Sequence, residues 1–486
     1  MSQLSPTHRW LFLGIISLGL FMIGVDNSIL YTALPTLRSE LHTSEVLGLW
    51  IINAYPLVLA GLLLGTGTLG DKIGHRRMFE IGLVIFGLAS LAAAFSPTPE
   101  FLIAARAALG VGAATMMPAT LALLRLTFTD IRQRNTAIGV WGAVATLGAA
   151  SGPVIGGLLL EHYWWGSVFL INVPVVIVAL IATFALAPEN IAQPDRHWDF
   201  LSSLWAMVAM VGVVVFIKEI TNAGITSLLG MSIALIVIGG FLFSRRQKLL
   251  PEPILSLDIF TNPVFSAGVL GAGVAMFVLA GSELMTTQRF QLSVGFSPLE
   301  AGLLTATAAL AAFPTSILGG ATLHRVGFRP LISGGFIVMA VGAAIAVWGA
   351  HAEVFSLFVA GMIALGAGGG LVMSVTSTAI IGSAPAKRAG MASAVEEVSY
   401  EFGTLLTVAV LGSLLPALYA YFAPAEVASD FDRGLHHPIY ALEAHHAFDT
   451  AYMLVLGVAG TVALVAALIT AVLLAGNPKE PEYAHE

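Results

Sequence analysis

No cysteine occurs in this sequence, and charged residues are scarce. The lack of cysteine excludes disulfide bonds, thiolate metal sites and cysteine nucleophiles. Asp, Glu, Lys and Arg make up only 10% of the 486 residues, whereas a soluble protein carries about 25%. Hydrophobic residues make up 57% of the chain, and the mean hydropathy is +0.90. The composition therefore predicts an integral membrane protein.

Long apolar segments recur along the whole chain. A membrane-spanning helix needs about 20 apolar residues, and we count fourteen segments that meet this requirement. The connections between them are mostly short, so we expect no sizeable soluble domain. The fold class predicted is all-α, with fourteen transmembrane helices. The predicted spans are 10–34, 46–70, 78–96, 101–125, 136–159, 167–187, 200–220, 224–243, 264–290, 298–320, 330–349, 354–382, 390–416 and 447–475.

Basic residues concentrate in alternate connections, which predicts the topology. With both termini in the cytoplasm, sixteen of the 21 Lys and Arg residues fall on the cytoplasmic side, and essentially Arg38 and Arg433 fall outside. This asymmetry follows the positive-inside rule. A count of thirteen spans would put the basic residues of the C-terminal half on the wrong side. The sixteen residues are Arg9, Lys72, Arg76, Arg77, Arg125, Arg132, Arg134, Arg196, Arg245, Arg246, Lys248, Arg325, Arg329, Lys387, Arg388 and Lys479.

Two motifs occur twice at a nearly constant spacing. The connection at residues 67–77 shares a frame of Gly, basic residue, Gly and Arg with residues 320–330, at an offset of 253. The pair of glycines at 110–112 recurs at 366–368, at an offset of 256. Spans one to six and nine to fourteen are therefore predicted as two related halves, an architecture typical of transporters.

The repeat divides the chain into three predicted parts. Spans seven and eight lie between the two halves and are interpreted as an insertion. The parts are an N-terminal six-helix half (1–190), two inserted spans with their linkers (191–250), and a C-terminal six-helix half (251–486) that contains a long outer loop near 417–446.

Asp26 is the only charged residue of the first span and lies near its middle. A charge at the centre of a spanning helix costs at least ~2.5–3.5 kcal/mol on insertion scales, so it marks a functional site by default. Four more acids lie within later spans. Glu283 is in span nine, and the repeat offset places it beside Asp26 as a pseudo-symmetric mate. The other three, in span thirteen, are Glu396, Glu397 and Glu401.

The acids of span thirteen suggest a mechanism. Glu397 and Glu401 share a helix face because they are four residues apart, with Glu396 turned about 100° from Glu397. Acids in a shared, water-poor site can exchange protons near physiological pH. We therefore predict that a lipophilic cation and protons compete for these carboxylates. Aromatic side chains that could add cation–π attraction are Trp50, Tyr55, Trp141 and Tyr400.

Arg106 is a second isolated charge, in span four. A guanidinium at this depth must find a carboxylate or another acceptor. One interpretation is a coupling partner that favours the charged form of an acid. The other is a structural arginine satisfied by backbone carbonyls. At the equivalent place in span twelve the residue is Met362.

Four motifs carry a resemblance to a known family. They are residues 67–77 after span two, 102–112 in span four, 148–157 in span five and 26–35 in span one. Together they resemble the major facilitator superfamily, and within it the fourteen-span drug:proton antiporters. The resemblance covers the whole chain. It implies a major facilitator fold and a proton-coupled exporter of cationic amphipathic compounds in the bacterial inner membrane, acting as a monomer without a cofactor.

The resemblance also implies roles for two groups of residues. The connection after span two would latch the outward-open state, with Asp71 facing the helix N-terminus of span thirteen or eleven. The alternative is a solvated basic loop. The members of this group are Gly67, Asp71, Gly74, Arg76 and Arg77.

The span-five motif is typical of exporters. Its glycines recur at four-residue spacing on one face, where another helix can approach closely, and its proline permits a kink. The alternative is plain tight packing. The residues of this motif are Gly148, Gly152, Pro153, Gly156 and Gly157.

The predicted outer loop contains two histidine pairs, at 436–437 and 445–446. No spacing among them is diagnostic of zinc, so we favour an exposed polar loop or an extracellular gate and predict no metal site.

Other classes of protein fit less well. An importer of an anionic metabolite would need basic residues in several spans, and only Arg106 qualifies. An ATP-driven pump is disfavoured because no G-x-x-x-x-G-K-[ST] phosphate loop occurs. A membrane-embedded enzyme is disfavoured because no H-E-x-x-H motif or serine constellation stands out. A proton-coupled transporter of an endogenous metabolite remains the alternative. We expect cationic amphipathic molecules, protons and lipid as partners, and no nucleic acid.

Overall fold

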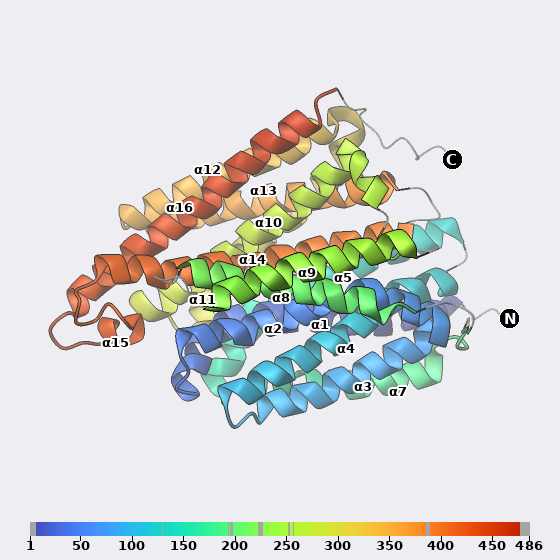
Figure 1. The fold of residues 1–486 in the computed structure, drawn as a ribbon, viewed down its shortest axis with the longest axis horizontal. Helices are drawn as coiled ribbons and strands as arrows, with labels where there is room; N and C mark the ends of the chain where they lie inside the picture. Colours follow the sequence, from blue (N-terminus) through green and yellow to red (C-terminus); the bar gives the residue numbers. More distant parts are fainter. Residues whose placement is uncertain are drawn as a thin grey trace. The chain divides into compact units, whose positions relative to one another are not determined.

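The computed structural model describes residues 6–128, 130–192, 194, 198–221, 227–250, 253–255, 257–384 and 389–476. Across these residues the regular structure is helical, and no strand is found. Fourteen long helical segments of the described chain follow the order of the predicted spans (Figure 1). Thirteen of them are long and apolar enough to cross a membrane by length and composition; the remaining one is α5. The predicted all-α membrane fold is confirmed.

The chain forms two compact units. The first comprises Met1–Val211 and Leu235–Ile254, and the second Gly212–Ala234 and Leu255–Glu486. The predicted domain boundaries after residues 190 and 250 stay a prediction. Nine helices of the described chain precede residue 255, and the last two of them are divided between the units. They are α1 (Pro6–Glu40), α2 (Glu45–Ile73), α3 (His75–Ala94), α4 (Pro99–Thr127), α5 (Ile131–His162), α6 (Ser167–Leu170), α7 (Asn172–Leu186), α8 (Phe200–Thr221) and α9 (Ser227–Leu249).

The second unit continues with helices of similar length. A five-residue π-helical turn, η2, directly extends its first long helix. The elements are η1 (Leu257–Thr261), α10 (Pro263–Gln288), η2 (Arg289–Ser293), α11 (Pro298–Val326), α12 (Phe328–His351), α13 (Phe355–Gly382), α14 (Ala389–Phe422), α15 (Phe431–Leu435) and α16 (Ala441–Leu473).

Corresponding helices of the two units have corresponding neighbours. In the first unit α1 packs on α5 and α7, and α4 packs on α2 and α3. In the second unit α10 packs on α14 and α16, and α13 packs on α11 and α12. The internal repeat seen in the sequence therefore has a counterpart in how each unit is packed.

The same glycine turn ends the second helix of each half. Gly74 between α2 and α3 has φ of 96°, and Gly327 between α11 and α12 has φ of 89°. Side-chain-bearing residues rarely adopt this left-handed region, so glycine is required there. Gly67 was predicted to belong to the connection between the two helices, but it lies inside α2 because that helix continues to Ile73.

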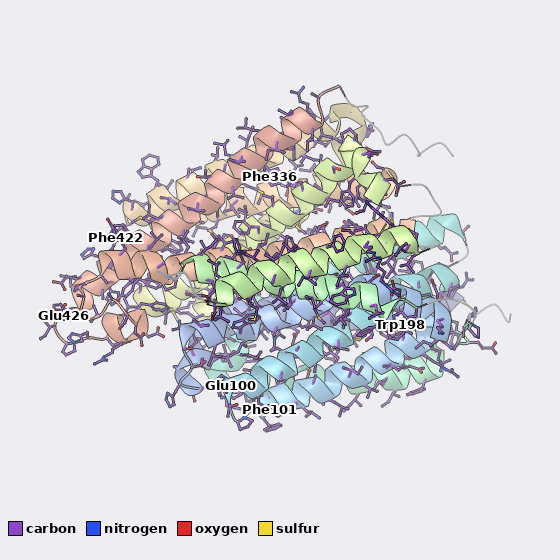
Figure 2. The ribbon with its side chains drawn as sticks, in the orientation of Figure 1. Glu100, Phe101, Trp198, Phe336, Phe422 and Glu426 are labelled. Atoms are coloured by element: carbon purple, nitrogen blue, oxygen red, sulfur yellow. The ribbon has the colours of Figure 1, made fainter. Side chains whose placement is uncertain are left out.

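Exposed apolar side chains cover the outside of the helices. Phe101 on α4 is 47% exposed and Phe422 at the end of α14 is 44% exposed, and both are seen on the ribbon in Figure 2. Such a surface suits lipid, because the helices satisfy their own backbone hydrogen bonds.

The predicted outer loop at 417–446 is shorter than expected. Helix α14 continues to Phe422 and α16 begins at Ala441, so His445 and His446 lie within a helix. The prediction failed because the first turns of α16 are polar on one face, which lowers their mean hydropathy. Their other face is buried through Ala444, Ala447 and Phe448.

Helix α8 packs on the first unit through α2. A Cβ at Gly61 of α2 would lie 2.7 Å from the Cβ of Met207, and one at Gly65 would overlap Ser203. Small residues four apart allow this close helix approach. Helix α9 is joined to the residue that precedes α8 by an ion pair of 2.8 Å between Arg246 Nε and Asp199 Oδ1.

Some of the basic residues used to predict the topology lie outside the described residues. These are Arg196, Lys387, Arg388 and Lys479, together with the side chains of Arg125, Arg132 and Arg134. The topology stays a prediction.

Candidate functional site

Asp26 and Arg106 form a buried ion pair within the first unit. Arg106 Nη1 on α4 lies 2.5 Å from Asp26 Oδ2 on α1. The exposed fraction is 1% for Asp26 and 0% for Arg106. Arg106 Nε also donates to the carbonyl oxygen of Ile51 at 3.2 Å. The guanidinium thus has both a carboxylate and a backbone carbonyl as partners, and its predicted role in coupling stays a prediction.

Three further side chains complete this network. Asn172 Nδ2 on α7 donates to Asp26 Oδ1 at 2.9 Å and also lies 3.2 Å from the hydroxyl of Ser90 on α3. The Arg106 guanidinium carbon lies 4.5 Å from the ring centroid of Tyr55 on α2. Helices α1, α2, α3, α4 and α7 therefore converge on one charge pair. Removing one partner of a buried pair costs about 3–5 kcal/mol, because the other charge is left uncompensated.

The sequence interpretation missed Asn172 and Ser90. Asn172 is 1% exposed and Ser90 is 0% exposed. The signal that could have found Asn172 is its amide side chain at the start of a strongly apolar span, since a polar group in that setting needs a partner. Ser90 gives no such signal, because a serine can bond to its own helix backbone.

The glycines of span five hold α1 close to α5 around Asp26. A Cβ at Gly148 would lie 2.6 Å from the carbonyl oxygen of Phe21, and one at Gly152 would lie 2.9 Å from the backbone nitrogen of Ile29. A Cβ at Gly156 would lie 2.6 Å from Ile29 Cγ1. The predicted close helix approach is therefore present, and it fixes α1 on both sides of the acid. Two further residues of the motif, Pro153 and Gly157, lie buried on the same helix.

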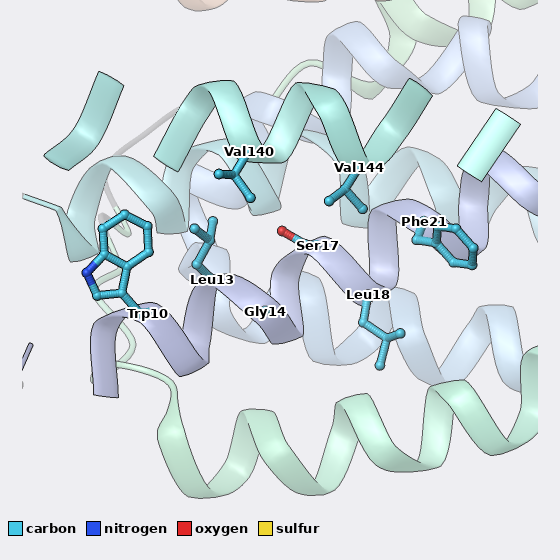
Figure 3. Close-up of a pocket in the computed structure, with 8 residues that line it drawn as sticks. All are labelled: Trp10, Leu13, Gly14, Ser17, Leu18, Phe21, Val140 and Val144. Carbon is cyan, nitrogen blue, oxygen red and sulfur yellow. The ribbon is translucent and has the colours of Figure 1, made fainter. Parts of the chain in front are cut away.

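An apolar groove runs along α1 on the N-terminal side of Asp26, between α1 and α5 (Figure 3). Its volume is about 490 Å³, within the range of small-molecule pockets. The Ser17 hydroxyl is buried there and has no hydrogen-bond partner among the described residues. The lining residues are Trp10, Leu13, Gly14, Ser17, Leu18, Phe21, Val140 and Val144.

The connection between α2 and α3 is tied to its own unit. His75 Nε2 lies 3.0 Å from Asp71 Oδ1, and Arg76 Nε lies 2.9 Å from Glu80 Oε1. The backbone N–H of Arg77 donates to Asn190 Oδ1 at 3.2 Å. The expected contact of Asp71 with span eleven or thirteen concerns the other unit and stays a prediction.

The acids of the second unit lie on neighbouring helices, α10 and α14. Glu396 and Glu401 are each 7% exposed. The Tyr400 hydroxyl donates to Glu396 Oε1 at 2.8 Å, and Ser377 on α13 is a second hydrogen-bonding partner of Glu396. Glu397 is near enough to Glu396 and Glu401 for electrostatic repulsion. The three acids of α14 therefore lie close together, and their role in binding cations and protons stays a prediction.

Glu283 lies at a different level from that cluster. Gly273 of α10 packs against Gly403 of α14, and Gly281 packs against Leu411. Glu283 is therefore level with residues about twelve positions beyond Glu401, which is about 18 Å along the helix at 1.5 Å per residue. Its Oε1 atom is buried and has no hydrogen-bond partner among the described residues. The acids of the second unit thus occupy two separate levels.

A second ion pair, at the end of α10, escaped the sequence interpretation. Arg289, where α10 passes into η2, places its Nε 2.9 Å from Asp449 Oδ1 on α16. Ser293 Oγ contacts both Asp449 Oδ1 at 3.3 Å and His445 Nδ1 at 3.1 Å. The Arg289 guanidinium carbon lies 5.1 Å from the ring centroid of Tyr452. Asp449 was overlooked because it stands at the edge of the span predicted from 447. No group of His, Asp and Glu suited to a metal is found among the described residues.

The comparisons with known proteins agree with this architecture. The multidrug efflux pump LfrA of Mycolicibacterium smegmatis is 35% identical over 415 residues, covering 85% of this chain and 82% of that protein. The methyl viologen resistance protein SmvA of Salmonella typhimurium is 38% identical over 416 residues, covering 84% and 83%. The solved structure of an inward-facing bacterial homolog of the human lysosomal transporter Spinster shares the fold, with a TM-score of 0.67 at 15% identity over 97% of this chain and 98% of that one.

The predicted resemblance to drug exporters such as SmvA is confirmed by these relatives. The family model described as Major Facilitator Superfamily matches residues 16–294 and 264–485. The chain therefore belongs to the major facilitator superfamily.

Proposed function

We propose that this chain exports lipophilic cations in exchange for protons, by alternating access across a bacterial inner membrane, with both termini in the cytoplasm. The substrates would be quaternary ammonium compounds, viologens, cationic dyes and biocides. The names of two relatives, a multidrug efflux pump and a methyl viologen resistance protein, support the proposal. No cofactor is needed, because the proton gradient supplies the free energy.

The observation that carries the proposal is the cluster of three neighbouring acids on α14. Arg289 is matched by Asp449, whereas Glu396 is held by hydroxyl groups and repels Glu397. Like charges in a buried cluster are relieved by a bound cation or by protons. A cation and protons would therefore compete for the α14 cluster, and the arrival of one would release the other.

The first unit would link protonation to movement. A proton on Asp26 would leave Arg106 as a buried charge without its counterion, which is costly. The unit can avoid this cost when Arg106 separates from Asp26 as the proton arrives. Because the pair joins α1 to α4, protonation of Asp26 would change how these two helices pack.

The test is proton release in everted membrane vesicles that hold a proton gradient. We expect methyl viologen or a quaternary ammonium compound to dissipate the gradient in vesicles with the wild-type protein. Asp26→Asn and Glu397→Gln should abolish this response at equal protein abundance. Glu100→Gln is the matched control, because Glu100 lies exposed in the first turn of α4. Normal transport by Asp26→Asn would overturn the central role of this acid.

The same vesicle assay distinguishes the export of cations from the alternative, the transport of an endogenous metabolite. A protein that transports an endogenous metabolite would show no response to any of the cationic compounds. It would respond instead to members of a panel of neutral and anionic metabolites.

A further inference from the structure

Asn190 connects two segments of the first unit that are far apart in sequence. It lies in the linker after α7, four residues beyond Leu186. Its Nδ2 donates to the carbonyl oxygen of Ile73 at 2.8 Å, and its Oδ1 accepts from the backbone N–H of Arg77 at 3.2 Å. One side-chain amide thus bonds the end of α2 and the start of α3.

These two bonds satisfy groups that helix geometry leaves without partners. The last carbonyls and the first N–H groups of a helix have no partner within that helix. Gly74 stands between α2 and α3 and has no side chain with which to cap α3. The amide of Asn190 supplies the missing donor to α2 and the missing acceptor to α3. It therefore acts as a cap for both helices, contributed from more than a hundred residues away.

Gly74 is also shaped to receive Asn190. A Cβ at Gly74 would overlap the Oδ1, Nδ2 and Cγ atoms of the Asn190 amide. Position 74 therefore requires glycine for two reasons. Its backbone φ is 96°, and the amide of Asn190 occupies the space that a side chain would fill. The alternative interpretation, a solvated basic loop, explains neither the φ of Gly74 nor the space that Asn190 occupies.

The connection caps α7 in return. Arg76 Nη1 donates to the carbonyl oxygens of Ala187 at 3.1 Å and Pro188 at 3.3 Å, and Nη2 donates to that of Phe184 at 3.4 Å. A cation is favoured at the C-terminal end of a helix. Each segment therefore satisfies the open helix end of the other, through Asn190 in one direction and Arg76 in the other.

We infer that Asn190 is a positioning residue of the transport cycle, which holds the α2–α3 connection and the end of α7 together as one rigid piece. This piece leads directly into the linker to α8. The inference uses the proposed export of cations only for its transport assay. Substrate binding itself should not depend on Asn190, since its amide bonds to backbone groups of Ile73 and Arg77 at helix ends.

The test compares three variants with wild type in the vesicle assay, using methyl viologen as the probe. Asn190→Leu loses both bonds, Asn190→Asp keeps only the acceptor, and Gly74→Ala displaces the amide. We expect Asn190→Leu and Gly74→Ala to lower the maximal rate about thirtyfold, since two hydrogen bonds are lost at about 1 kcal/mol each and about 1.36 kcal/mol is a factor of ten in rate. The KM should stay within about twofold, and Asn190→Asp should lie between Asn190→Leu and wild type. Glu189→Gln, an exposed neighbour, is the control that should transport normally.

A second measurement needs no substrate. The chain has no cysteine, so Leu186→Cys in the last turn of α7 gives a single, half-buried thiol. Adding Asn190→Leu should raise its rate of maleimide labelling about tenfold, as the end of α7 separates from the connection. An unchanged rate, or a fall in transport that only follows the amount of folded protein, would overturn the inference. Wild-type vesicles that ignore methyl viologen would count against the proposed function alone, because the labelling test would still decide the role of Asn190.

Discussion

The two units share a packing scheme but treat their membrane-embedded acids differently. In the first unit Asp26 is neutralised by Arg106 and bonded by Asn172. In the second unit Met362 stands at the position equivalent to Arg106, and Glu283 keeps a buried oxygen without a hydrogen bond among the described residues. The repeat has kept the helix contacts while the charges have diverged. In the proposed function, Asp26 would keep Arg106 as its counterion until it takes a proton, whereas Glu283 would start without such an ion pair.

Arg106→Met should have the largest effect on stability, because it gives the first unit the residue of the second. Asp26 would be left buried without its counterion, at a cost of about 3–5 kcal/mol. We expect a large drop in the midpoint of thermal unfolding in detergent. The double variant Asp26→Asn with Arg106→Met should recover most of the loss, since no charge remains. If Arg106→Met unfolded at the same temperature as wild type, the buried Asp26 would not need its counterion, and the contrast with the acids of the second unit would be lost.

Gly152→Ala should have the next largest effect, and Gly281→Ala is its counterpart in the second unit. A Cβ at Gly152 would overlap Ser28 Oγ and lie 2.9 Å from the backbone of Ile29, whereas one at Gly281 would meet the Leu411 side chain at 2.5 Å. Backbone cannot move aside as a leucine rotamer can. We expect a loss of about 1–3 kcal/mol at Gly152 and less at Gly281, measured by thermal unfolding. Equal losses would mean that both helix pairs are packed equally tightly.

Arg289→Met should destabilise less than Arg106→Met. The Asp449 side chain is 34% exposed, against 0% for Asp26, so solvent can screen the charge left behind. We expect a loss near about 1 kcal/mol, as for partly exposed pairs. Thermal unfolding of both arginine variants, side by side, measures the contrast. If Arg289→Met lost as much stability as Arg106→Met, the two ion pairs would contribute equally to stability despite the exposure of Asp449.

The spans were predictable because an apolar run of about 20 residues is a local property. Asp26 and Arg106 could each be found as isolated charges in apolar segments. Their pairing could not, because it joins residues 80 positions apart and depends on how α1 and α4 pack. Asn190 gave no signal, since an asparagine in a polar linker usually needs no partner from elsewhere. Mean hydropathy also misplaced the start of α16, because the first turns of this helix are polar on one face and buried on the other.

Glu283→Gln should change stability least of these variants and transport most. Within the described residues no ion pair is found for this carboxylate, and its Oε1 atom has no hydrogen-bond partner there. A neutral amide of the same shape therefore removes a burial cost and loses little in return. We expect an unfolding midpoint equal to or above that of wild type, together with loss of proton release on adding methyl viologen. Asp26→Asn should instead lower both quantities, because it strips Arg106 of its counterion. If the two variants lost stability equally, Glu283 would hold a structural partner as Asp26 does, and the two units would not differ in how they hold their buried acids.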